Sequence, residues 1–201
     1  MKIKDLMEMP IKGNKDDWDF NKLSDEIQKY TISQLNGIDV IVKKNNKKYA
    51  IKKDYSQFLF FELKEGENLN YIGYLTFTHF NTKLVKNPIQ VQEIEIHKKY
   101  RRQGLATFFY ESIHNKYGYS LISDEIQYEN SRRIWKSLSQ KGCVVILNTE
   151  NNTVTECYKI HNVDDDSIWC NSCHSIFLAL VTKHHYFENL EKYLNPTNEI
   201  K

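Results

Sequence analysis

The chain has 201 residues, enough for one globular domain with a modest extension but cramped for two full domains. Because 40% of its residues are apolar and 13% are aromatic, the composition excludes disorder as a description of the whole chain. Its 28 basic and 26 acidic residues leave a net charge of +2, too small a surplus to favour a nucleic-acid-binding protein.

The N-terminal sequence and the hydropathy predict a cytoplasmic protein with no membrane partner. The charged start, Met1–Asp5, is followed by no apolar run of the kind that a signal peptide needs. The best apolar run, Ile176–Thr182, is far shorter than the roughly 18 residues that span a bilayer. In such a protein we expect the four cysteines, at positions 143, 157, 170 and 173, to be reduced thiols.

The first third of the chain predicts one helix and two hairpins. Apolar residues recur three or four positions apart over 17–30, which is typical of an amphipathic helix. Two short runs rich in β-branched and aromatic residues, 38–43 and 49–52, flank a polar turn and indicate a hairpin. The longer runs 57–63 and 71–80 predict a second hairpin.

The rest of the chain alternates strands and helices. In chain order we expect a strand over 89–96, a helix from Leu105 to a C-cap at Gly118, a strand over 119–123, a helix that starts near Asn130 and ends at Gly142, and strands over 143–147 and 154–160. This order predicts an α/β layered fold with a mixed sheet. We expect one domain over 1–163, with 164–201 as a C-terminal extension packed on it.

The segment Arg101–Thr107 joins a predicted strand to a predicted helix and carries the chemistry of an anion site. A pyrophosphate needs several backbone N–H donors, which a loop that turns into a helix supplies together with the positive end of the helix dipole. Gly104 permits close approach and unusual backbone angles, and Ala106 keeps the first turn uncrowded. Arg101 and Arg102 add positive charge.

In this context Arg101, Gly104 and Ala106 resemble the signature of the GNAT N-acetyltransferase superfamily, and the preceding strand and following helix are in the expected order. The resemblance implies a three-layer α/β fold with a mixed, mostly antiparallel sheet of about six or seven strands flanked by helices. It also implies an acyltransferase that moves an acetyl group from acetyl-coenzyme A to a primary amine of a protein or small molecule. The implied coenzyme-binding residues are Ile94, Ile96, Arg101, Arg102, Gln103, Gly104, Leu105, Ala106 and Thr107.

The catalytic residues are less well defined by the resemblance. A base near the thioester would deprotonate the amine, and Glu93 and Glu95 are the candidates, with a solvated or salt-bridged strand face as the alternative. Trp135 stands where many family members have a tyrosine acid, and an indole cannot perform that step. Tyr128, with Ser131, Ser123 or solvent as alternatives, would then protonate the departing thiolate.

Three other interpretations stay open. The alternative to the enzyme is a catalytically weak or inactive GNAT-like module that binds coenzyme A, a macromolecular partner or both. The basic segment Lys43–Lys48 and the Arg101 loop suit nucleic acid, although the nearly balanced charge makes that partner the weaker choice. Cys170, Cys173 and His174, with a fourth ligand from Cys157, His184 or His185, have part of a zinc-site pattern, but a second close pair is missing, so we expect no metal.

Overall fold

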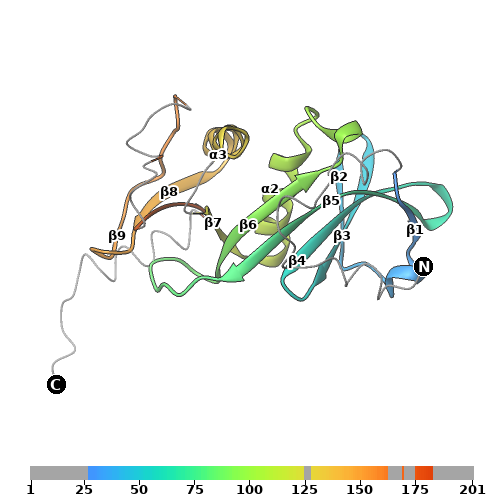
Figure 1. Cartoon of the computed structure of the whole chain (residues 1–201), viewed down its shortest axis with the longest axis horizontal. Coiled ribbons are helices and arrows are strands. Elements are labelled where there is room, and N and C mark those ends of the chain that lie inside the picture. Colours follow the sequence, from blue (N-terminus) through green and yellow to red (C-terminus); the bar gives the residue numbers. More distant parts are fainter. Residues whose placement is uncertain (1–26, 125–127, 163–168, 170–174, 183–201) are drawn as a thin grey trace, which may run out of the picture. The chain divides into compact units, whose positions relative to one another are not determined.

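The computed structural model describes residues 27–124, 128–162, 169 and 175–182, and in these ranges the chain forms ten strands and two α-helices (Figure 1). The strands are β1 (Lys29–Thr31), β2 (Val40–Lys44), β3 (Lys47–Asp54), β4 (Gln57–Leu63), β5 (Asn68–His79), β6 (Pro88–Ile96), β7 (Ser120–Ile122), β8 (Cys143–Asn148), β9 (Thr153–Val154) and β10 (Ile176–Val181). The helices are α2 (Leu105–Tyr117) and α3 (Glu129–Lys141). Within the described part, no helix has the length and apolar character needed to cross a membrane.

The strands follow the order β2-β3-β4-β5-β6-β7-β10-β8-β9, with β1 paired to β5. The chain divides into two units, and β5 and β6 contribute residues to both. The first unit holds the described residues up to Leu75 together with Ile94–Gln103, and the second holds Thr76–Glu93 and the described residues from Gly104 onward.

The first unit is built on antiparallel pairs of β2 with β3 and of β3 with β4. The turn between β2 and β3 consists of Asn45 and Asn46, which both have positive φ, as a two-residue hairpin turn requires. Buried apolar side chains form a core cluster in this unit, among them Ala50 of β3, Phe61 of β4 and Leu69 of β5. The unit therefore holds the turn between β2 and β3 in a defined register.

The second unit contains both described α-helices. β6 and β7 are parallel, and β10 is antiparallel to both β7 and β8, so β6, β7 and β8 run in the same direction. α2 and α3 are the crossovers between them, and right-handed crossovers in this order place both helices on one face of the sheet. Tyr110 of α2 packs edge-to-face on Trp135 of α3, with 5.8 Å between the ring centroids, which agrees with this placement.

Helix α2 follows from its sequence. Leu105, Phe109 and Ile113 recur four residues apart and are all buried, so one face of the helix packs into the core. Gly118 ends the helix in the left-handed conformation, at φ 71°, and its N–H donates to the carbonyl of His114. The predicted start and C-cap of this helix are both confirmed.

Gly73 marks a close approach of β5 to β6 within the first unit. A Cβ atom built on Gly73 would lie 2.0 Å from the carbonyl oxygen of Glu95, a distance that no side chain tolerates. The neighbouring backbone N–H of His97 donates to the carbonyl of Ile72 at 2.7 Å. Glycine at position 73 therefore allows the end of β6 to lie directly against β5.

The structure corrects several sequence-based expectations. The sheet has ten strands, where about six or seven were expected, and two of them, β1 and β10, lie outside the strands that the sequence predicts. The prediction of a helix over 17–30 is wrong at Tyr30, which lies in β1 opposite Leu69, while residues 17–26 lie outside the described residues. The ring of Tyr30 packs edge-to-face on Phe61, so aromatic packing outweighs the helical spacing there.

Near the C-terminus, the run 176–181 is β10, which lies between β7 and β8. The strand expected over 154–160 ends at Val154. Beyond it, single hydrogen bonds tie the chain to β8, from the N–H of Thr155 to the carbonyl of Ile146 and from the N–H of Tyr158 to that of Val144. The described helices also occupy one face only, so the described residues do not form the third layer that the family resemblance implies.

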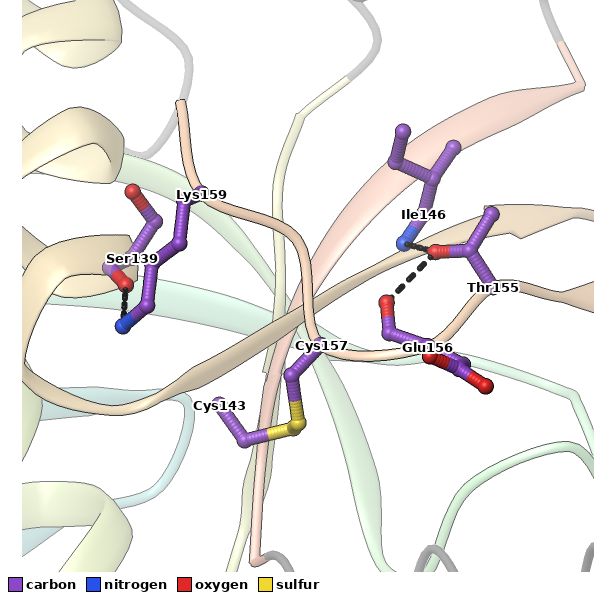
Figure 2. The surroundings of a disulfide bond; sticks show 7 residues. All are labelled: Ser139, Cys143, Ile146, Thr155, Glu156, Cys157 and Lys159. Carbon is purple, nitrogen blue, oxygen red and sulfur yellow. Dashed lines mark hydrogen bonds between the residues drawn. A yellow bond between two sulfur atoms is a disulfide. The ribbon is translucent and has the colours of Figure 1, made fainter. Parts of the chain in front are cut away.

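The expectation of reduced thiols is wrong for Cys143 and Cys157, which form a disulfide with 4.9 Å between their Cα atoms (Figure 2). Cys143 begins β8, and the segment after β9 turns back along that strand, so the two side chains meet. Sequence spacing gave no sign of this pairing, because it depends on how the chain returns. Cys170 and Cys173 lie outside the described residues.

Candidate functional site

The loop after β6 is closed by Arg101. A short 3₁₀ turn, Lys98–Tyr100, follows the strand, and the Nε of Arg101 then donates to the carbonyl of Ile96 at 2.7 Å. A terminal guanidinium nitrogen of Arg101 also lies 3.7 Å from the Oε1 of Glu95. The structure thus brings together three predicted site residues, and it uses Arg101 to hold the loop against the end of β6.

The backbone conformation of the next residues suits an anion-binding loop. Arg102 has φ +60° and Gly104 has φ +66° and ψ +23°, both in the left-handed region, and Leu105 begins α2. A left-handed residue followed by a helical one turns successive N–H groups toward the same point, which forms an anion-binding concavity. The N-cap residue of α2, Gly104, has no side chain of its own to cap the helix. The first-turn N–H groups have no acceptor within the helix, so they and the helix dipole favour an anion there.

Side chains in the first turn of α2 point into the protein. Leu105 and Thr107 are buried and Ala106 is half-buried, whereas Gln103 and Gly104 are exposed. A ligand at this helix end would therefore meet backbone groups first. The hydroxyl of Thr107, which the resemblance counts among the coenzyme-binding groups, belongs to a buried side chain.

The residue before the loop, Tyr100, is anchored to a buried carboxylate that the sequence did not reveal. Its hydroxyl donates to the Oε2 of Glu62 at 2.9 Å and accepts from the side-chain amide of Asn70 at 3.4 Å. Glu62 is 3% exposed, and the Nζ atoms of Lys47 and Lys64 lie 3.2 and 2.8 Å from its oxygens. This network ties the start of the loop to β3 and β4.

The network has defined protonation states at neutral pH. Burial alone would raise the pKa of the Glu62 carboxyl, but the hydrogen bonds that it accepts outweigh burial and hold that pKa below its ordinary value. Burial is also the main reason why the pKa of Tyr100 is raised to about 12. The carboxylate is therefore charged and the phenol is neutral, as the donor and acceptor roles require.

Replacing Tyr100 with phenylalanine is expected to lower the free energy of unfolding by about 2 kcal/mol at pH 7, because a buried hydrogen bond to a charged group is lost. A carboxyl with a lowered folded-state pKa stabilises the protein above its unfolded pKa, and this contribution disappears as the pH falls through the folded pKa. Tyr100→Phe raises the pKa of Glu62. The variant should therefore lose less unfolding free energy than the wild type as the pH falls.

Urea unfolding at pH 7 and at several acidic pH values measures this difference. Tyr55→Phe is the matched control, because Tyr55 is 86% exposed. Equal unfolding free energies for Tyr100→Phe and Tyr55→Phe at pH 7 would show that the hydroxyl of Tyr100 does not anchor the loop.

The predicted catalytic residues have different environments. Glu93 is exposed on β6, whereas the side chain of Glu95 is 31% exposed and faces Arg101. Tyr128 is 68% exposed and precedes the first residue of α3. Trp135 is 1% exposed and packs on Tyr110, so it is a packing residue of the core.

The alternative acids differ from Tyr128 in burial. The Oγ of Ser123 is buried and accepts a hydrogen bond from the backbone N–H of Leu178 at 3.0 Å, while Ser131 is half-buried in the first turn of α3. Tyr128 is the most exposed of these hydroxyl groups.

The zinc alternative loses one of its ligands. Cys157 is in a disulfide and cannot supply a thiolate, whereas Cys170, Cys173, His174, His184 and His185 lie outside the described residues. Within the described ranges, no three His, Cys, Asp or Glu side chains gather as metal ligands do.

No protein-family model matches the sequence, and no curated protein matches it significantly. A solved structure similar to this chain is a protein from Bacteroides thetaiotaomicron named "Putative acetyltransferase from GNAT family". The two chains share 9% identity, the match covers 71% of this chain and 75% of the other, and the TM-score is 0.34.

Proposed function

We propose that the chain is a GNAT-type acetyltransferase that moves the acetyl group of acetyl-coenzyme A to a primary amine of a protein or small molecule. The observation that carries the proposal is the left-handed Gly104 at the start of α2, directly after the loop that Arg101 closes. Its geometry suits a pyrophosphate, because several backbone N–H groups converge where the helix dipole is positive. The pyrophosphate of acetyl-coenzyme A is such a group.

The pairing of β6 supports a place for the rest of the coenzyme. The parallel register of β6 with β7 covers Pro88–Gln90 and Ser120–Ile122, whereas β6 continues to Ile96. A strand that runs beyond its neighbour has backbone groups that an extended ligand can bind by adding to the sheet edge. We propose that Ile94 and Ile96 bind the coenzyme in this way.

The proposed transfer needs a base and an acid. The amine loses a proton as its nitrogen attacks the thioester carbonyl, the carbon–sulfur bond breaks, and the thiolate of coenzyme A takes up a proton. We propose Glu93 as the base, because it is exposed, whereas Glu95 faces the guanidinium of Arg101. The exposed phenol of Tyr128, or solvent, would supply the proton to the thiolate, whose ordinary pKa is about 8.5.

Calorimetry with acetyl-coenzyme A, followed by a thiol-release assay over a panel of amines, tests this function. We expect binding and amine-dependent release of free thiol, with Glu93→Gln retaining binding and losing at least about tenfold in turnover. The absence of coenzyme binding would refute the proposal.

A GNAT-like module without turnover is the second candidate. The buried Trp135, at the position where the family resemblance implies a tyrosine acid, favours it. Coenzyme binding without thiol release on any amine, together with a protein partner that copurifies with the chain, is the outcome that separates it from the enzyme.

A further inference from the structure

The antiparallel pairing of β7 with β10 changes at Ser123, the residue that follows β7. The register sets Ile122 opposite Ala179, so Ser123 comes opposite Leu178. The N–H of Ser123 donates to the carbonyl of Leu178 at 2.8 Å. A regular pair also has the return bond, from the N–H of Leu178 to the carbonyl of Ser123. Here that N–H donates to the Oγ of Ser123 at 3.0 Å instead, so the hydroxyl takes the place of the carbonyl.

The carbonyl of Ser123 has a different partner. It accepts from the side-chain amide of Gln90, on β6, at 3.4 Å. Gln90 is the last residue of β6 in the parallel register with β7, where it lies opposite Ile122. Ser123 is 3% exposed, and a carbonyl in a buried place needs a donor. The hydroxyl of Ser123 and the amide of Gln90 therefore let the chain leave the ladder while its polar groups stay paired.

This arrangement ends β7 at a defined place beside β6. The N–H of Ser120 donates to the carbonyl of Asn87, and alternate residues of a strand bond to the same neighbour. A straight continuation of β7 would therefore set the N–H of Asp124 against the carbonyl of Val91. The departure of the chain at Ser123 keeps β7 off the edge of β6 from Val91 onward.

We propose that Ser123 and Gln90 are positioning residues that keep the edge of β6 available to the coenzyme. This inference rests on the proposed function, in which the coenzyme lies along β6 at Ile94 and Ile96. An extended ligand adds to a sheet edge through backbone hydrogen bonds, and it can do so only where no strand already pairs with that edge. Neither side chain needs to touch the coenzyme, because each acts through the course of β7.

Ser123→Ala removes the hydroxyl and lets the backbone return to the ladder. Leu178 is buried, so its N–H then needs a new acceptor, and the carbonyl of residue 123 is the one that a regular antiparallel pair supplies. Once this carbonyl turns back to β10, β7 continues straight and the N–H of Asp124 pairs with Val91. We expect this variant to bind coenzyme A about tenfold more weakly than the wild type.

Calorimetry with coenzyme A and NMR measure the two parts of this effect. Ser120→Ala is the matched control, because Ser120 is a buried serine at the other end of β7, and it should bind as the wild type does. NMR couplings across hydrogen bonds show which carbonyl each N–H donates to. The amide nitrogen of residue 123 should couple to the carbonyl carbon of Leu178 in the wild type and in Ser123→Ala. The amide nitrogen of Leu178 should couple to the carbonyl carbon of residue 123 only in Ser123→Ala.

Two results overturn the inference. One is equal affinity for coenzyme A in Ser123→Ala and Ser120→Ala, since the hydroxyl of Ser123 would then not control access to β6. The other is a coupling from Leu178 to the carbonyl of Ser123 in the wild type, since the hydroxyl would then not replace that carbonyl. Failure of the proposed function differs from both. If coenzyme A does not bind the wild type, the GNAT-type assignment and the positioning role fall together, whatever the couplings show.

Discussion

Replacing Gly104 with valine is expected to weaken coenzyme A binding by about 100-fold while the protein still folds. Gly104 has φ +66°, a conformation that is a marked outlier for a β-branched residue, so valine forces the backbone to change. The N–H groups that start α2 then no longer converge. Losing one or two hydrogen bonds to a charged group, at about 1.5–3 kcal/mol each, accounts for the loss of affinity.

Gly118 provides the control for this substitution. It has φ +71° and ψ +22°, nearly the same conformation as Gly104, but lies at the other end of the same helix. A Cβ atom on Gly118 would meet nothing within 4 Å, so Gly118→Val introduces backbone strain without a clash. Calorimetry should show wild-type affinity for Gly118→Val. Equal losses in both variants would mean that strain in α2, rather than the loop, controls binding.

The sequence predicted elements whose signals are local. The start and end of α2 follow from an apolar stripe and a glycine C-cap, and β4 follows from a run of aromatic residues. By contrast, β1 lies within a stretch that has helical spacing, and only its pairing with β5 makes it a strand. β10 shows no alternation of apolar and polar residues, because it lies between β7 and β8 and is buried along most of its length. An apolar run of this kind does not reveal the place of its strand in the sheet.

The candidate site also has a part that the local sequence predicts and a part that depends on long-range contacts. The loop Arg101–Ala106 is a local motif, and Gly104 has the unusual backbone angles that the sequence predicts for it. Glu62 lies in β4, where a buried carboxylate looks like an exposed one in the sequence until its partners are known. Those partners include Tyr100, which is 38 residues away, and the contact from Lys44 to Gln103 spans 59 residues. Such contacts depend on sheet register, which no single segment encodes.

The disulfide and the expected cytoplasmic location make opposite predictions for the thiols of Cys143 and Cys157. Cytosolic proteins rarely keep disulfides, because glutathione and thioredoxin reduce them. Figure 2 shows that the disulfide is one of several ties on the segment after β9. The Nζ of Lys159 also donates to the carbonyl of Ser139, and the Oγ of Ser139 accepts from the N–H of Ile160 at 3.0 Å. Reduction would leave these hydrogen bonds to hold the segment on α3.

Replacing Cys157 with serine is expected to lower the free energy of unfolding by about 3 kcal/mol in oxidising buffer. The two cysteines are 14 residues apart, and closing a loop of about this length removes that much conformational entropy from the unfolded chain. Dithiothreitol should lower the stability of the wild type by the same amount and leave Cys157→Ser unchanged, so the variant is its own control. Thermal unfolding with and without the reductant measures both effects, and about 3 kcal/mol corresponds to a shift of roughly 6–12 °C for a chain of this size. If dithiothreitol leaves the wild-type midpoint unchanged, the two thiols are not paired in solution. Their reduced state would then agree with the expected cytoplasmic location.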